Sequence, residues 1–231
     1  MTIYGRSNQI KVILAALSQL GVDVESLTPG DLTSFDEYYG GGAGGTEYLV
    51  DMGNLKDFPA GCKDLDIGSG IGGPARTPPA EFGFVVTGLE PNEEFLNSAT
   101  ELTKRLGMTD VVSFVPGFST DLPFEDNSFD MVWTQNALMN VDDKTTTFQE
   151  SNRALRPGGT VDFQSVVWGP NSGFEYAVPC ADDESTNFLV PASELRGIAA
   201  GSGLMEFHWF EGTPDTATPF PLSTPTLSTS G

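Results

Sequence analysis

The stretch that decides the fold lies at residues 62–76 and reads C-K-D-L-D-I-G-S-G-I-G-G-P-A-R. A short apolar run ends there in four glycines, at positions 68, 70, 72 and 73, which predicts a strand, a tight turn and the start of a helix. Glycine lets the backbone take positive φ and lets a ligand approach the main chain. The helix N-terminus that follows offers unpaired N–H groups and a partial positive charge. The stretch therefore predicts a site for a nucleotide-like ligand.

Two kinds of ligand fit such a turn. Gly68-x-Gly70-x-x-Gly73 satisfies the dinucleotide fingerprint, and Glu90 lies at a suitable distance to accept hydrogen bonds from a ribose. Asp66 favours the other kind, because a carboxylate at the turn would repel a pyrophosphate and attract a cationic ligand without phosphate.

Residues 65–76 resemble the first motif of class I S-adenosylmethionine-dependent methyltransferases. The likeness is to the small-molecule branch, which contains sterol, quinone and glycine/sarcosine/dimethylglycine methyltransferases. It continues in order through V86-T-G-L-E-P91, residues 121–133, residues 134–144 and A154-L-R-P-G-G159, and it covers roughly residues 10 to 210. The resemblance implies S-adenosyl-L-methionine as methyl donor and a small molecule as acceptor.

The implied fold is α/β, a doubly wound, Rossmann-like and mostly parallel sheet with an N-terminal helical lid. We expect three regions: a lid segment at 1–57, a cofactor-binding core at 58–211 and a Pro/Ser/Thr-rich tail at 212–231. Strands are expected at about 62–67, 84–89, 111–115, 129–134, 160–166 and 205–210. Helices are expected at about 3–20, 46–55, 72–82, 92–106, 142–155 and 192–201.

Several features depart from the family pattern. Lys63 and Asp64 interrupt an apolar strand, so we expect that strand to be short or exposed at its start. Pro78 and Pro79 predict that the helix after the turn kinks or stops early. Residues 34–46 predict a glycine-rich loop. The tail shows no periodicity, so the last, antiparallel strand of the family is expected to be missing and the sheet edge open.

The resemblance assigns cofactor contacts around the turn and at the ends of the next strands. Glu90 is expected to bind the ribose hydroxyls. Phe118 stands where many relatives carry an aspartate, and a ring can only stack on the adenine. The full set of expected cofactor contacts is Asp66, Gly68, Ser69, Gly70, Gly72, Glu90, Pro91, Phe118, Ser119 and Gln135.

The acceptor is expected to lie beside residues 134–140 and an aromatic surround. Aromatic ring faces attract ammonium groups, which makes an amine acceptor attractive. The expected substrate contacts are Tyr38, Tyr39, Asn136, Met139 and Trp168. In-line methyl transfer needs no dedicated catalytic base, so no catalytic residue is assigned.

Composition excludes several classes of partner. The chain carries 11 Lys plus Arg against 32 Asp plus Glu, a formal net charge of −21, which disfavours nucleic acid and anionic membranes. Such charge also fits a protein kept soluble in concentrated salt. We expect a cytoplasmic protein with two reduced thiols, Cys62 and Cys180, and an open sheet edge that favours a homodimer. Neither His208 nor the acidic run at 182–184 has the spacing of a metal site, so no metal is expected.

Two alternatives stay open at this point. A nicotinamide-dependent oxidoreductase would use the same glycine turn. A degenerate methyltransferase fold, acting as a binding or regulatory module, would account for Tyr39, Phe118 and the prolines after Arg76.

Overall fold

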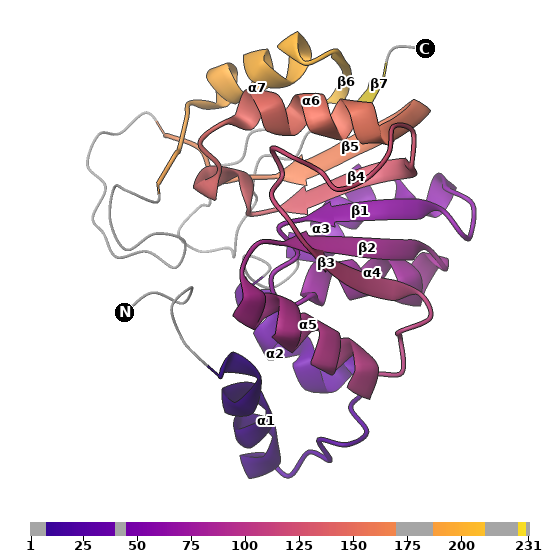
Figure 1. The fold of residues 1–231 in the computed structure, drawn as a ribbon, viewed down its shortest axis with the longest axis vertical. Coiled ribbons are helices and arrows are strands. Elements are labelled where there is room, and N and C mark those ends of the chain that lie inside the picture. The colour runs from indigo at the N-terminus through magenta and orange to yellow at the C-terminus, as the bar shows by residue number, and fades with distance from the viewer. Residues whose placement is uncertain (1–7, 40–44, 170–186, 211–225, 230–231) are drawn as a thin grey trace.

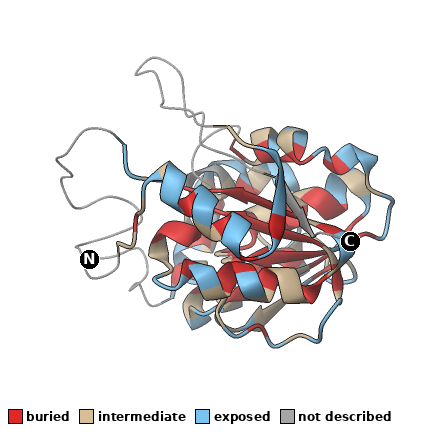
Figure 2. Cartoon of the chain, turned by 90° about the horizontal axis from the view of Figure 1, so that it is seen from above, coloured by how far each residue is buried: buried red, intermediate tan, exposed pale blue. Residues whose placement is uncertain are grey.

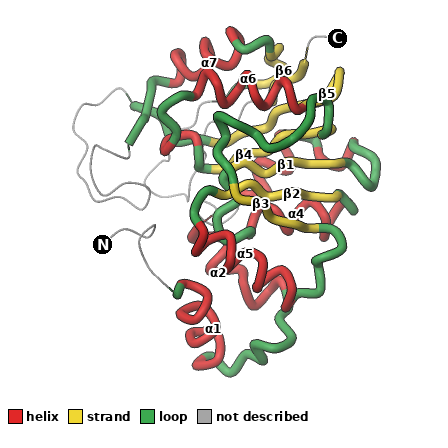
Figure 3. Tube along the Cα trace, in the orientation of Figure 1, coloured by secondary structure: helices red, strands yellow, loops and turns green. Residues whose placement is uncertain are grey.

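The structure is a computed structural model, and it describes residues 8–39, 45–169, 187–210 and 226–229. Seven strands form one sheet in the order β3-β2-β1-β4-β5-β7-β6 (Figures 1 and 3). Their bounds are β1 Lys63–Ile67, β2 Val85–Glu90, β3 Val112–Pro116, β4 Phe129–Gln135, β5 Leu155–Gln164, β6 Leu204–His208 and β7 Thr226–Thr229. The five strands β1 to β5 pair in parallel, and β7 is antiparallel to both β5 and β6. The doubly wound, mostly parallel sheet is thereby confirmed.

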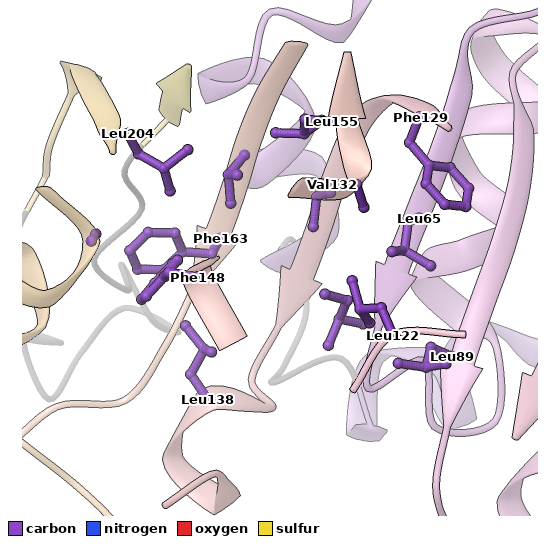
Figure 4. Packing of buried hydrophobic residues seen from close by; sticks show 14 of the residues in the cluster. Leu65, Leu89, Leu122, Phe129, Val132, Leu138, Phe148, Leu155, Phe163 and Leu204 are labelled. Atoms are coloured by element: carbon purple, nitrogen blue, oxygen red, sulfur yellow. The ribbon is translucent and has the colours of Figure 1, made fainter. Parts of the chain in front are cut away.

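Helices cover both faces of this sheet, and the N-terminal helices lie beside it (Figure 1). They are α1 Gln9–Gln19, α2 Pro29–Tyr39, α3 Gly45–Met52, α4 Gly73–Phe82, α5 Glu93–Arg105, α6 Lys144–Ala154 and α7 Ala192–Gly201, with 3-10 turns η2 Leu55–Asp57 and η3 Leu138–Asn140. α6 and α7 pack on one face, where Phe148 meets Phe163 of β5 at 5.2 Å between ring centroids (Figure 4). α3, η2 and α4 pack on the other face around Trp133. The strands β1, β2, β4 and β5 are therefore largely buried between two layers, as Figure 2 shows in red.

The N-terminal helices form a third apolar cluster with α5. Ile13 and Leu17 of α1, Leu32 of α2, and Phe95 and Leu102 of α5 are all buried in it. α2 was expected as loop, because it begins Pro-Gly and has few apolar residues; its buried Leu32 and half-buried Phe35 nevertheless give it a packing face. The division into a lid, a core and a tail stays a prediction.

Two expectations are wrong, and a third holds for one residue. The helix after the turn does not stop early: α4 continues through Pro78 and Pro79 to Phe82, and both prolines are buried. β1 is exposed at its start, as expected, but only at Lys63, because Asp64 is 1% exposed. The antiparallel strand is present, because Thr226–Thr229 from the tail inserts between β5 and β6.

Candidate functional site

The glycine turn joins β1 to α4 and is bonded to the end of β2. Gly68, Gly70 and Gly72 have φ of 76°, 54° and 83°, values that a side chain would strain. The N–H groups of Gly68 and Ser69 both donate to Leu89 O, at 2.8 and 3.2 Å. The turn is thus fixed at the carboxyl ends of two neighbouring parallel strands, where doubly wound sheets bind ligands.

Glu90 ends β2 and faces the turn. Its Oε2 accepts from Gly70 N and its Oε1 from Asn92 N, both at 2.9 Å, and its side chain is 6% exposed. Burial raises the pKa of Glu90, and the two main-chain hydrogen bonds partly offset that rise. Because both oxygens are held, the carboxylate has a fixed orientation.

A cavity of about 500 Å³ opens beside these residues. Eight residues expected at the site contribute to its wall: Gly68, Gly70, Glu90, Pro91, Phe118, Ser119, Gln135 and Asn136. Phe118 is 67% exposed, so its ring lies at the rim, and Ser119 Oγ is 2.8 Å from Thr147 Oγ1 of α6. Thr46 of α3 donates its hydroxyl to Gln135 Oε1 at 3.1 Å, which ties α3 to the cavity wall.

Three other expected cofactor contacts lie behind this wall rather than in it. Asp66 and Ser69 are buried, at 1% and 3% exposure, and Gly72 packs against Phe114 and Arg76. Burial, and then the neighbouring Glu90 carboxylate, raise the pKa of Asp66 to about 8. Asp66 therefore takes up a proton more readily than the carboxylate expected from the sequence.

The expected substrate contacts are only partly brought together. Asn136 lies in the cavity wall, in a left-handed conformation with φ of 53°. Met139 is buried beneath it, and Trp168 is 38% exposed and outside the wall defined by the described residues. The side chains of Tyr38 and Tyr39 lie outside the described residues, as does Cys180, while Cys62 is a buried free thiol.

The structure adds residues that the sequence analysis did not place at the site. Phe95, Asp142, Asp143 and Phe188 also line the cavity. Phe188 comes from a distant segment that is pinned to the wall, because its N–H donates to Met139 O at 2.9 Å and its carbonyl accepts from the buried Lys144 Nζ. No pattern in the sequence indicates Phe188. Asp142 and Asp143, by contrast, lie within residues 134–144, which the resemblance includes.

Asp143 is anionic for a local reason. Its Oδ1 accepts from Thr146 N at 2.9 Å and its Oδ2 from Thr146 Oγ1 at 2.6 Å, so it caps α6 and its pKa is lowered. The cavity wall thus carries a negative charge at Asp143.

The geometry suits a ligand with a ribose and a polar group near the turn. A Cβ at Gly70 would meet no atom within 4 Å, so the main chain is open there to a ligand. Two buried polar atoms beside the turn, Asp66 Oδ2 and Ser69 Oγ, have no hydrogen-bond partner in the described part of the chain. Across the same described ranges, no group of three or more His, Cys, Asp or Glu side chains is arranged to hold a metal.

A family model described as a methyltransferase domain matches residues 65–163, from β1 to the end of β5. This match, with the relatives below, supports a class I S-adenosylmethionine-dependent methyltransferase domain over these residues. The matched range includes the glycine turn, Glu90 and most of the cavity wall. The resemblance to the small-molecule branch is confirmed.

Named relatives agree with this family. The domain is 33% identical over 112 residues to a glycine/sarcosine/dimethylglycine N-methyltransferase of Actinopolyspora halophila, covering 48% of this chain and 20% of that protein. It is 39% identical over 99 residues to a sterol 24-C-methyltransferase of Gibberella zeae, covering 43% and 26%. The chain thus spans far less than two thirds of the length of these relatives.

A solved structure gives the same fold. Phosphoethanolamine N-methyltransferase 2 of Haemonchus contortus, in complex with S-adenosyl-L-methionine, superposes with a TM-score of 0.61 at 25% identity, covering 77% of this chain and 42% of that one. Neither alternative, the oxidoreductase or the degenerate module, is favoured by these comparisons. No helix in the described ranges is long and apolar enough to cross a membrane.

Proposed function

We propose that this chain binds S-adenosyl-L-methionine in the cavity beside the glycine turn and transfers its methyl group to a small molecule. The observation that carries the proposal is Glu90, held by Gly70 N and Asn92 N at the end of β2, where a carboxylate accepts hydrogen bonds from ribose hydroxyls. Pro91 and Phe118 supply apolar surface for the adenine beside it.

Bound S-adenosylmethionine would supply an electrophilic methyl group on a positively charged sulfur. The chain's own task is to hold an acceptor in line with that methyl group and to exclude water. Asn136, Asn140 and Phe188 line the same cavity and are available for this task. When the acceptor is an amine, it must be neutral in the transfer step, so an amine that binds as an ammonium ion first releases its proton to water.

We further propose an amine as the acceptor. Anionic Asp143, with Asp142 beside it, and the aromatic ring of Phe188 line the same cavity, and this combination attracts a cation. N-methyltransferases among the relatives support the proposal, although sterol C-methyltransferases match this chain equally well.

Thermal unfolding with S-adenosylhomocysteine, and with NADH as the control ligand, tests cofactor binding. Ligand at about 100 times its dissociation constant adds roughly 2.7 kcal/mol, which raises the midpoint by about 5–10 °C in a domain of this size. Glu90→Ala should remove this rise, whereas Glu125→Ala, an exposed glutamate outside the cavity wall, should keep it. A rise of the unfolding midpoint with NADH alone would favour the nicotinamide-dependent oxidoreductase instead.

Turnover separates the acceptor classes. Formation of S-adenosylhomocysteine with sarcosine or dimethylglycine, and none with a sterol or a hydroquinone, would support the amine acceptor. The reverse pattern would reject the amine acceptor and leave methyl transfer intact.

A further inference from the structure

Arg76 lies behind the glycine turn and bridges it to α2. Its side chain, on α4, is 5% exposed. Nη1 donates to Ile71 O of the turn at 2.9 Å, and Nη2 donates to Asp36 Oδ1 of α2 at 2.8 Å. One buried guanidinium therefore connects a main-chain carbonyl of the turn to a carboxylate of the N-terminal helices.

The next two residues of the turn pack directly on this ion pair. A Cβ at Gly72 would lie 2.8 Å from Arg76 Nη1, and a Cβ at Gly73 would lie 2.8 Å from Cβ and Cγ of Asp36. Ile71, Gly72 and Gly73 thus each contact the pair, whereas Gly68 and Gly70 line the cavity. The ion pair thus contacts one part of the turn, and the ligand cavity is lined by the other part.

We propose that the Asp36–Arg76 ion pair positions the glycine turn for the cofactor and thereby makes cofactor affinity depend on the docking of α2. Both are positioning residues, because neither belongs to the wall of the cofactor cavity; they line a separate cavity of about 300 Å³ between α2, α3 and α4. The inference rests on the proposed function, since it concerns the same cofactor.

The ion pair can act this way because it is poorly hydrated. Asp36 is 25% exposed, and burial raises its pKa more than the Arg76 charge lowers it. Loss of the Asp36 charge would leave the guanidinium buried with only neutral acceptors, Ile71 O and Thr103 Oγ1. Removing one partner of a buried ion pair is destabilising, because the other charge is left uncompensated. Here the uncompensated Arg76 guanidinium would disturb the three turn residues that contact it.

Calorimetric titration of S-adenosylhomocysteine into the full chain tests the proposal. Asp36→Asn and Arg76→Met should each weaken binding by about fivefold or more, within the usual range of coupling between sites. The double variant should bind no more weakly than the weaker single variant, because the two residues act as a unit.

Glu206→Gln is the matched control. Glu206 pairs with Arg196 on the opposite side of the sheet order and is 28% exposed, close to the 25% of Asp36. Its replacement should leave S-adenosylhomocysteine affinity within about twofold of wild type. A surface ion pair contributes at most about 1 kcal/mol to stability, so any fall in the unfolding midpoint should be small.

The outcomes separate the two hypotheses. No binding by the folded wild-type chain rejects the proposed function. Wild-type binding with unchanged affinity in Asp36→Asn, or an equal loss in Glu206→Gln, overturns the positioning role and leaves the proposed function standing. If Asp36→Asn does not fold, Arg76→Lys serves instead. A lysine keeps the positive charge opposite Asp36 but lacks the second donor group that binds Ile71 O. The affinity for S-adenosylhomocysteine should therefore still fall, and an unchanged affinity would overturn the proposal.

Discussion

Replacement of Asp64 by valine should stabilise the protein. Asp64 lies in the middle of the sheet at 1% exposure, and neither carboxyl oxygen has a well-placed hydrogen-bond donor among the described residues. Burial, followed by the neighbouring carboxyls of Asp66 and Asp162, raises its pKa well above the ordinary value, and the Leu65 N–H offsets this only in part. The position costs stability, and an apolar side chain would remove that cost.

The size of the gain follows from the burial. Burying a polar group without a hydrogen bond costs about 1–3 kcal/mol in proteins, and an apolar side chain of similar volume removes that cost. Valine also suits a strand because it is β-branched. In a domain of this length each kcal/mol raises the midpoint by about 2–4 °C.

The gain should also grow with pH. The folded state keeps a proton on Asp64 that the unfolded chain releases near pH 4, so this contribution to stability is complete below that pH and is lost as pH rises toward the raised pKa. The advantage of Asp64→Val should therefore increase by up to about 1.4 kcal/mol per pH unit over that window. Asp66 will keep some pH dependence in the variant, because its own pKa is raised to about 8.

Urea unfolding of wild type and Asp64→Val at several pH values between 5 and 9 measures both effects. Asp110→Val, at an exposed aspartate, is the control and should change stability by less than about 0.5 kcal/mol. A variant no more stable than wild type at neutral pH, or a gain that does not change with pH, would refute the reasoning.

Three further changes have defined outcomes. Gly53→Ala should destabilise the protein by about 1–3 kcal/mol in chemical unfolding, because the new Cβ would lie 2.0 Å from Asp162 Oδ2. Gly197→Ala, in α7, should instead stabilise it by about 0.5–1 kcal/mol, because the new Cβ would have no atom within 4 Å. Equal effects of the two substitutions would contradict the packing at Gly53. Asp143→Ala removes the cap of α6 and should cost about 0.5–2 kcal/mol, and an unchanged midpoint would argue against that cap. Raising salt from about 0.1 to 1 M shortens the screening length from about 10 to 3 Å and should raise the midpoint of a chain with net charge −21, whereas indifference to salt would reject adaptation to concentrated salt.

The alternating core was predictable because its signals are local. Gly68 and Gly70 fix the turn, Pro91 and Asn92 precede α5, and apolar runs mark the buried strands, so β1 to β4 and α4 to α6 begin and end within a few residues of expectation. Gly68, Gly70 and Glu90 could be expected near one another for the same reason, and they share one cavity wall. These elements depend little on distant parts of the chain.

The elements that were missed depend on tertiary packing. α2 carries Pro29 and Gly30 and gains its stability from burying Leu32 in the cluster with α1 and α5. The strand Thr226–Thr229 is short and polar, and its identity comes from the ladder partners Thr160–Asp162 and Leu204–His208. Phe188 reaches the cavity only because Lys144 and Met139 hold its main chain. No spacing in the sequence reveals such contacts.

The position of β7 has a consequence for synthesis on the ribosome. Within the part of the chain that the structure describes, β6 joins the sheet through β7 and has no ladder with β5. Until residues 226–229 have emerged from the ribosome, the edge of β5 lacks the strand that pairs with it in the folded protein, and Met205 and Phe207 of β6 are exposed even after folding. Open edges of this kind recruit other strands. The nascent chain therefore passes through an interval in which a chaperone, or a neighbouring nascent copy, can occupy the place that β7 will later fill.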